Sequence, residues 1–226
     1  MNIAIVSAQT WNITSAIGAH TVSAIFICGV FVFGVSGGLA GAQKNLDFFG
    51  AVVIAVVVGM SGGAFRDIFL GIAAKEIFDW RVVTAALAGG LIAFLAHVPL
   101  LRFQSSIQIL DAVGLSLFSV IGADISLIHN AGPLASVILG LTTGIIGGII
   151  RDVILNEIPQ VFKAGLYAIP SVLASGLVVI GYELKINSIF WYAAAAVVCF
   201  AVRLAGIVFD INLPQAKKRQ ASDSLT

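Results

Sequence analysis

The sequence predicts an all-helical membrane protein with seven transmembrane helices, arranged as two inverted three-helix repeats plus a seventh helix. Three observations predict this class. Of the 226 residues, 59% are apolar and only 10% are charged, and the mean hydropathy is +1.07. The apolar residues form seven runs long enough to cross a bilayer, and the chain aligns with itself at an offset of 85 residues. Because soluble domains carry about 25% charged residues, this composition excludes an ordinary soluble or disordered chain.

The predicted spans follow one another with short connections, so no soluble domain fits between them. A bilayer-crossing helix needs about 20 mostly apolar residues, and polar clusters, glycine and proline divide the runs. The spans are predicted at residues 20–42, 48–70, 82–101, 107–128, 133–155, 165–182 and 188–209. They form one transmembrane domain over residues 1–209, with repeat one at about 20–101 and repeat two at about 107–182. Residues 210–226, which contain Pro214 and a short basic run, are expected to be a disordered cytoplasmic tail.

The positive charges favour one orientation in the membrane. Cytoplasmic loops retain Lys and Arg, and an odd number of spans places the two ends on opposite sides. With a cytoplasmic C-terminus, the outside holds only three of the 12 Lys and Arg residues, namely Lys75, Arg81 and Lys185. The sequence therefore favours an N-terminus outside and a C-terminus inside.

Several other functional classes are not expected. The net charge of +1, without a clustered basic surface before the tail, gives no case for nucleic-acid binding. Cys28 and Cys199 lie inside apolar runs, where thiols act as small packing residues, so neither a metal site nor a cofactor is expected. Two G-x-S-x-G matches, starting at Gly34 and Gly59, lack the strand and the His base of a hydrolase. The sequence thus predicts no catalytic residues and no enzyme.

The internal repeat rests on an alignment without gaps. Over the 42 positions from Gly29 to Leu70, twelve residues are identical to those 85 positions later, where a glycine-rich apolar chain gives roughly four by chance. The repeating unit contains three spans. Because three is odd, the second copy enters the membrane from the opposite face, which relates the copies by a two-fold axis in the membrane plane.

The strongest part of the repeat is a motif of two glycines, an arginine and an aspartate. Its members are Gly62, Gly63, Arg66 and Asp67 in the first copy, and Gly147, Gly148, Arg151 and Asp152 in the second. On a helix each arginine lies over the glycine pair three and four residues earlier, where no side chain covers the backbone. The glycines are therefore predicted to be kink positions, and the arginines can donate to carbonyl groups that a bend releases.

The charged members of the motif favour a hydrated path between the repeats. An Arg or Asp at the centre of a span costs about 2.5–3.5 kcal/mol on insertion scales, so these groups need partners or water. Neighbouring residues on a helix point about 100° apart, so Arg66 and Asp67 are expected to find a partner across the repeat or through water rather than each other. The alternative is that glycine pairs only pack helices and that an Arg-Asp pair near a helix end only reaches the headgroups.

Two further carboxylates are candidates. Asp111 and Asp124 lie about one turn inside the two ends of the fourth span, where each can line a cation-attracting vestibule or be solvated at the interface. Arg203, in the last two turns of the seventh span, is expected to reach the cytoplasmic interface.

The tandem motif on a seven-span chain resembles the prokaryotic members of the trimeric intracellular cation (TRIC) channel family, over roughly residues 26–209. The resemblance implies a homotrimer in an inner membrane, bacterial or archaeal, with one pore in each protomer. That pore is lined by the second and fifth helices, bent at their glycines. Arg66, Asp67, Arg151 and Asp152 then lie along the conduction path and in the gating network, and potassium is the implied permeant ion.

Three functions follow as hypotheses. The first is a potassium channel. Because the duplicated segment also resembles bacterial membrane proteins described as glycine transporters, the second is a carrier for glycine or another small solute at the same repeat interface. The third, a structural or lipid-binding membrane protein, leaves the four charged motif residues without a shared cavity.

Overall fold

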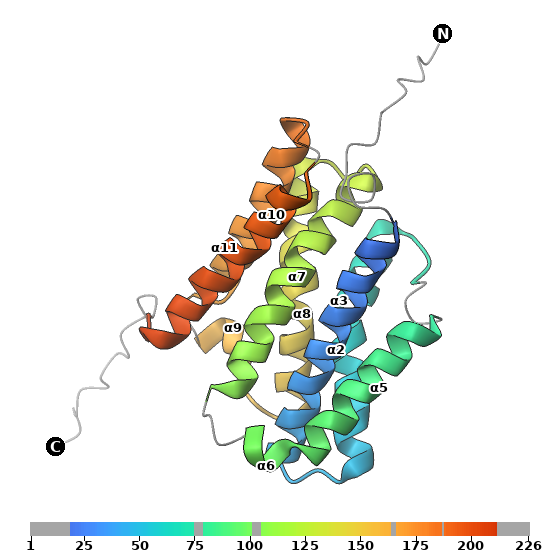
Figure 1. Ribbon diagram of the computed structural model, residues 1–226, viewed down its shortest axis with the longest axis vertical. Coiled ribbons are helices and arrows are strands. Elements are labelled where there is room, and N and C mark those ends of the chain that lie inside the picture. The colour runs from blue at the N-terminus through green and yellow to red at the C-terminus, as the bar shows by residue number, and fades with distance from the viewer. Residues whose placement is uncertain (1–18, 75–78, 101–104, 164–165, 187, 212–226) are drawn as a thin grey trace, which may run out of the picture.

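A computed structural model describes residues 19–74, 79–100, 105–163, 166–186 and 188–211 as a bundle of long helices (Figure 1). Most of the predicted tail therefore lies outside the described residues. The long helices are α2 (Ala19–Gln43), α3 (Phe48–Leu70), α5 (Trp80–Leu95), α7 (Ser106–Ile128), α8 (Pro133–Ile154), α10 (Ala168–Glu183) and α11 (Ile189–Val208). Two short helices, α6 (His97–Leu100) and α9 (Gln160–Lys163), lie in the connections.

A helix occupies each of the seven predicted spans. The bounds of α3 agree with the prediction because capping residues frame it: Asp47 accepts a hydrogen bond from the Gly50 amide, and Gly71 ends the helix with a φ of 65°. The third span is shorter than predicted, since α5 ends at Leu95 and α6 follows. Pro99 explains this end, because proline has no backbone N–H with which to continue the helical hydrogen bonding.

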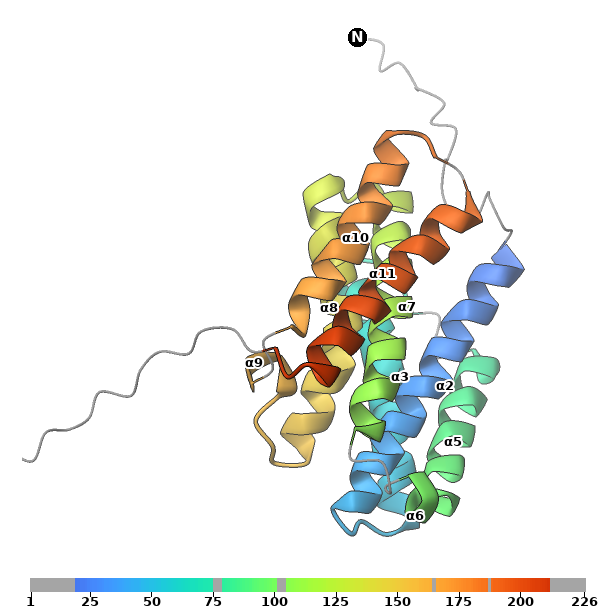
Figure 2. The same ribbon diagram turned by 60° about the vertical axis from the view of Figure 1, so that its left-hand side comes forward.

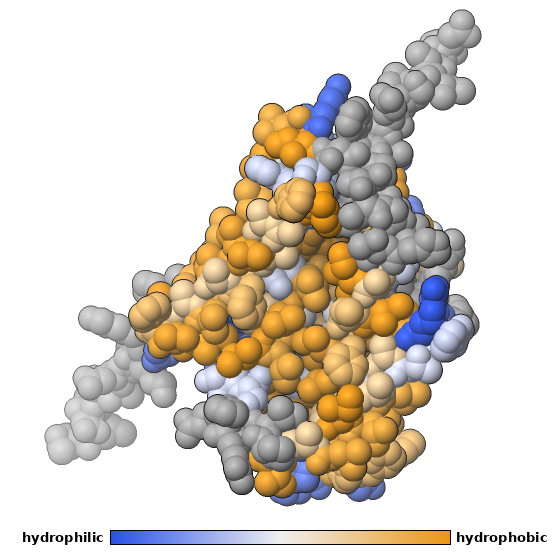
Figure 3. Space-filling model, viewed as in Figure 1, coloured by the Kyte–Doolittle hydropathy of each residue, from blue (hydrophilic) through white to orange (hydrophobic). Residues whose placement is uncertain are grey.

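The surface of the bundle is that of a multi-pass membrane protein. Five of the described helices, α2, α3, α7, α8 and α11, are long and apolar enough to cross a membrane, and α5 and α10 are shorter apolar helices of 16 residues. Large apolar side chains such as Phe49 and Phe190 are 75% and 81% exposed. Figure 3 shows apolar residues over most of one face, with hydrophilic ones mainly near helix ends. A soluble monomer does not expose so much contiguous apolar surface.

The helices pack as two similar groups. Helices α2, α3 and α5 contact one another, and α7, α8 and α10 do the same, while α11 packs on α7 and α10 (Figures 1 and 2). α2 and α7 run in opposite directions in Figure 1. The loops after these two helices also correspond, because Asn45 and Asn130, which are 85 positions apart, adopt φ angles of 58° and 57°.

Phenylalanine rings join the two groups at the centre of the bundle. The rings of Phe33 in α2 and Phe118 in α7 are 5.2 Å apart, and both are fully buried. Each ring lies over a glycine of the other helix: a Cβ built on Gly29 would be 2.5 Å from Phe118, and one built on Gly114 would be 2.8 Å from Phe33. The contact is reciprocal at the 85-residue offset, which is what a two-fold relationship between the groups produces.

Candidate functional site

The candidate site begins where α3 and α8, the helices that carry the two motifs, cross. Gly62 of α3 lies against the carbonyl oxygen of Thr143, and Gly147 of α8 lies against the carbonyl oxygen of Val58, with 2.8 Å to a built Cβ in the second case. The two contacts are equivalent under the repeat, because Gly147 and Thr143 stand 85 positions after Gly62 and Val58. Helices α3 and α8 are continuous through both glycine pairs. In this structure the glycines therefore permit close contact between the helices.

The arginine and aspartate of the first motif are buried in the protein. Arg66 is 1% exposed and Asp67 is 2% exposed, so neither faces lipid. Arg66 donates from Nε and Nη2 to Oδ1 of Asp67, at 2.8 and 2.6 Å. The expectation that these neighbours do not pair was wrong. The 100° rule describes the directions of the Cβ atoms, whereas the long arginine side chain bends its guanidinium round to the adjacent carboxylate.

Arg151 of the second motif joins three helices. Its Nε donates to Asp152 Oδ1 at 2.9 Å, and its Nη1 donates to Ser36 Oγ of α2 at 2.7 Å and to Asp111 Oδ1 of α7 at 2.8 Å. The arginine is 1% exposed. Arg151 thus pairs with its adjacent aspartate, as Arg66 does, and it also binds Ser36 of the other repeat.

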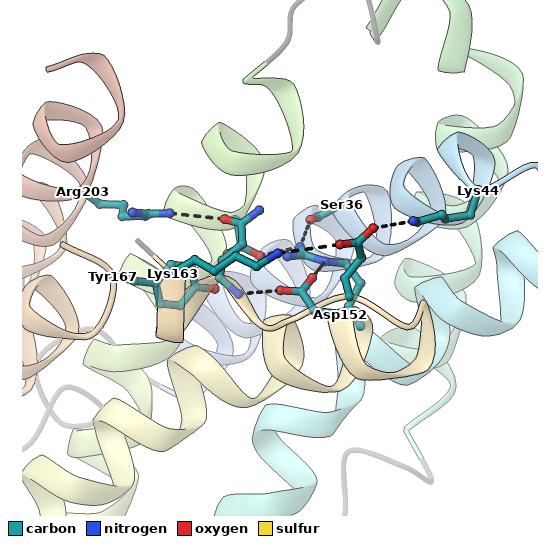
Figure 4. A network of polar contacts seen from close by, with 10 residues as sticks. Ser36, Lys44, Asp152, Lys163, Tyr167 and Arg203 are labelled. Atoms are coloured by element: carbon teal, nitrogen blue, oxygen red, sulfur yellow. Dashed lines mark hydrogen bonds and ion pairs between the residues drawn. The ribbon is translucent and has the colours of Figure 1, made fainter. Parts of the chain in front are cut away.

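A second layer holds the partners of Arg151. The Tyr167 hydroxyl donates to Asp111 Oδ2, and the backbone N–H of Gln160 donates to Asp152 Oδ2 at 2.9 Å. On the other side of Tyr167, the guanidinium of Arg203 in α11 lies 4.5 Å from the ring centroid. Figure 4 shows this group of side chains at the end of α8.

Arg203 does not reach the membrane interface as expected, because it is only 2% exposed. Its Nη1 donates to the Leu166 carbonyl oxygen at 3.1 Å, and its Nη2 lies 3.4 Å from Gln160 Oε1. The helix end alone suggested that the side chain would reach out of the membrane. The tyrosine ring and the carbonyl instead hold it inside.

Asp111 and Asp124 are both fully buried. Neither therefore lines an open vestibule in this structure, and neither is solvated at the interface. Asp111 is paired with Arg151 and Tyr167, and Asp124 interacts with Tyr192 of α11. Both residues lie near the ends of a predicted span, but a position along a helix does not show whether the side chain is buried in the bundle.

Two cavities lie near opposite ends of α2. The Arg151 cavity, of about 200 Å³, is lined by Arg151 and Asp152 together with Ala40 and Ile107. The Phe26 cavity, of about 170 Å³, is lined by residues that include Phe26, Val82, Val22 and Ile125. Val22 and Ile125 stand 85 positions from Ile107 and Ala40, but Arg66 and Asp67, the counterparts of Arg151 and Asp152, are not among the residues that line the Phe26 cavity.

An ion-pair bridge stands at the rim of the Arg151 cavity. Lys44, in the loop after α2, donates to Glu157, in the loop after α8, and Lys163 lies 3.8 Å from the other oxygen of the same carboxylate. The hydrogen bond from Lys44 is the main cause that holds the pKa of Glu157 below its usual range. The bridge thus connects the two helix groups at this end of the molecule.

Three residues of the site, Ser36, Tyr167 and Gln160, were not predicted from the sequence. Ser36 has an apolar repeat counterpart, Ile121, so the internal alignment gave no signal for it. Tyr167 could have been found as a lone tyrosine at the start of a span that follows the charged motif.

Comparisons with known proteins agree with a membrane protein built from a duplicated unit. A family model described as "Glycine transporter" matches the chain twice, over residues 23–98 and 108–183, so the matched segments start and end 85 residues apart. A UPF0126 membrane protein of Deinococcus radiodurans is 34% identical over 211 residues, covering 92% of this chain and 91% of the relative. The UPF0126 inner membrane protein YadS of Escherichia coli K12 is 33% identical over 197 residues, covering 83% and 92%.

Solved structures share the same fold. The TRIC trimeric intracellular cation channel orthologue from Rhodobacter sphaeroides superposes with a TM-score of 0.79 at 30% identity, covering 84% of this chain and 99% of that one. A prokaryotic TRIC channel crystallised in 0.5 M KCl gives a TM-score of 0.79 at 28% identity, covering 86% and 99%.

The fold and the buried charged site define a multi-pass helical membrane protein of the TRIC fold class. Within that class, the chain belongs to the family that the glycine transporter model describes, which is related to the TRIC channels.

Proposed function

We propose that this protein is a cation channel in which each chain contains its own path between α3 and α8. The observation that carries the proposal is that both motifs place buried arginine–aspartate pairs along the helices that cross at Gly62 and Gly147. Ionisable groups inside a membrane-spanning bundle mark ion or substrate paths. The likeness to TRIC cation channels at 30% identity supports cations as the transported species.

The same proposal includes seven membrane-crossing helices, arranged as two inverted three-helix repeats plus α11. The opposite directions of α2 and α7 and the reciprocal contacts of Gly62 and Gly147 support this arrangement. Inverted repeats place equivalent helices around a site near the middle of the bilayer, which is where α3 and α8 cross.

The path is closed in this conformation. A Cβ does not fit between Gly147 and the Val58 carbonyl oxygen without a shift, so an ion cannot pass at this contact. Opening requires α3 and α8 to separate or to bend. The glycine pairs are where the bend costs least, because glycine gives the helix the freedom to kink. The kinks at Gly62, Gly63, Gly147 and Gly148 thus belong to the open state.

Potassium is the proposed permeant ion, and a homotrimer is the proposed assembly, both on the strength of the likeness to channels described as trimeric. The inner membrane follows from the likeness to the inner membrane protein YadS. The N-terminus is placed outside and the C-terminus in the cytoplasm, following the distribution of Lys and Arg. Lipids contact the exposed apolar surface, and no nucleic acid takes part.

Recordings from purified protein in a planar bilayer test the channel directly. In a potassium chloride gradient without any amino acid, we expect unitary currents that reverse toward the potassium equilibrium potential. A carrier for glycine instead gives saturable glycine uptake into liposomes without unitary currents, and that result contradicts the proposal. A protein that passes neither potassium nor glycine supports a structural role.

A further inference from the structure

The two motifs differ in what surrounds them. Arg151 is held by a group that we call the Arg151 latch, consisting of Ser36, Asp111, Arg151, Asp152, Tyr167 and Arg203. The positions that correspond to Asp111 and Tyr167 in the first repeat are Phe26 and Val82. Both belong to one hydrophobic cluster, and neither has a side chain that can accept or donate a hydrogen bond. The duplication has therefore diverged at this end of the molecule.

Tyr167 is the central member of the latch. Its hydroxyl donates to one oxygen of Asp111, while the other oxygen accepts from Arg151 at 2.8 Å. Its ring lies 4.5 Å from the guanidinium carbon of Arg203, on the helix that stands outside the repeat. A carboxylate that accepts two such bonds has a fixed orientation, so Tyr167 sets the position of Asp111 and, through it, of Arg151.

Gly148 makes this arrangement possible. A Cβ on Gly148 would stand 2.5 Å from the Tyr167 hydroxyl oxygen and 3.5 Å from both carboxylate oxygens of Asp111. The second glycine of the motif thus leaves the space in which the tyrosine and the carboxylate meet, whereas Gly147 leaves the space for α3.

We infer that Tyr167 and Arg203 are positioning residues that keep Arg151 bound to Ser36. Through Arg203, α11 then sets the stability of the closed state at the end of the path where α8 ends. The inference rests on the proposed function. Arg151 can leave Ser36 only when Asp111 moves or when the bond between Arg151 and Asp111 breaks. Arg203 fixes the ring of Tyr167, and the hydroxyl of Tyr167 binds Asp111. Because Phe26 and Val82 replace the corresponding partners, this control acts on one end of the channel only.

Single-channel recording of Tyr167→Phe tests the inference, because the substitution removes the hydroxyl and retains the ring beneath Arg203. We expect the open probability to rise about tenfold, the change that follows from losing one hydrogen bond to a charged group. Tyr182→Phe, the same change at the other end of α10, is the matched control and leaves the open probability unchanged. Arg203→Gln and Gly148→Ala are also expected to raise the open probability. Either of them can replace Tyr167→Phe in the test if that variant fails to fold.

A double variant separates positioning from a general loss of packing. If Tyr167 acts through Arg151, Tyr167→Phe adds nothing to the open probability of an Arg151→Gln channel. An equal tenfold effect in both backgrounds overturns the inference.

A labelling experiment decides the inference even if the protein carries no current. Ser36→Cys is introduced into a chain whose Cys28 and Cys199 are alanine, and the rate of modification by a small thiol reagent is measured in liposomes. Release of Arg151 uncovers position 36, so Tyr167→Phe is expected to increase the rate about tenfold and Tyr182→Phe to leave it unchanged. Equal rates for the two variants contradict the latch, whereas absent currents with a faster rate contradict only the proposed channel.

Discussion

Gly147 of α8 lies so close to Val58 of α3 that a Cβ on the glycine would stand 2.8 Å from the Val58 carbonyl oxygen. Real Cβ atoms do not approach a carbonyl oxygen so closely, so any side chain here must push the two helices apart. The same is true of Gly62 against Thr143, at the position that corresponds under the repeat. The motif glycines thus allow the backbones of α3 and α8 to meet where the two helices cross.

Gly147→Ala is predicted to destabilise the protein by about 1–3 kcal/mol, because overpacking at a backbone contact forces a shift of one helix. Thermal unfolding in detergent measures the effect. Gly176→Ala is the matched control, because nothing lies within 4 Å of a Cβ at that position in α10. The control is expected to be neutral or stabilising by up to about 1 kcal/mol, since alanine favours the helix over glycine. Equal destabilisation by both changes would count against close contact at Gly147.

Arg151→Ala is predicted to alter the open probability while the trimer persists. The change leaves Asp111 buried without its cation, and removing one partner of a buried pair costs about 3–5 kcal/mol. That cost falls on the closed conformation, so the channel opens more often. Bilayer recording measures the open probability, and the mass of the cross-linked oligomer shows whether the trimer persists. A variant that conducts like the parent would show that the second motif only packs helices.

The bridge between Lys44 and Glu157 is predicted to weaken in acid. Because the folded state lowers the pKa of Glu157, its stabilising contribution is complete above the unfolded value of about 4.3 and is lost as the pH falls through the lower folded value. Thermal unfolding measured between about pH 6 and pH 3 follows this loss. Glu157→Gln removes the titrating group, so the pH dependence of the variant is expected to be shallower than that of the parent. Identical curves would mean that the bridge does not form in solution.

The orientation can be tested with single cysteines. Lys44 and Lys185 lie in loops at opposite ends of the bundle and are exposed. In a chain whose two native cysteines are alanine, Lys185→Cys is predicted to react with an impermeant thiol reagent applied to intact cells, and Lys44→Cys is predicted to react only after lysis. The reverse pattern would place the N-terminus in the cytoplasm.

Hydropathy, polar clusters, glycine and proline were enough to predict most of the helices. The span at residues 48–70 is bounded by Asp47 and Gly71, whose preferences for helix ends are local properties of the chain. The contacts of Gly62 and Gly147 between α3 and α8 were not predicted, because the motif was interpreted as a pair of kink positions beside a hydrated path. The early end of α5 was missed because its hydropathy continues past Leu95, although Pro99 already carried the signal.

The partners of the charged residues could not be predicted in the same way. The pairing of Arg151 with Asp111 and Ser36 joins residues 40 and 115 positions away, and it depends on how three helices pack. The pairing of Arg66 with Asp67 depends on side-chain bending, because the helical repeat fixes only the direction in which a side chain begins. Asp111 and Asp124 were expected near water, but distance along a helix does not determine burial within a bundle.

The path between α3 and α8 is tested most directly by modifying Ser61, whose Oγ lies 3.6 Å from the Cβ position of Gly147. In a channel whose only cysteine is Ser61→Cys, a positively charged thiol reagent is predicted to reduce the unitary potassium current. The control is Val57→Cys, on an exposed part of α3, where the same reagent leaves the current unchanged. An unchanged unitary current after complete modification of Ser61→Cys contradicts a path between these two helices.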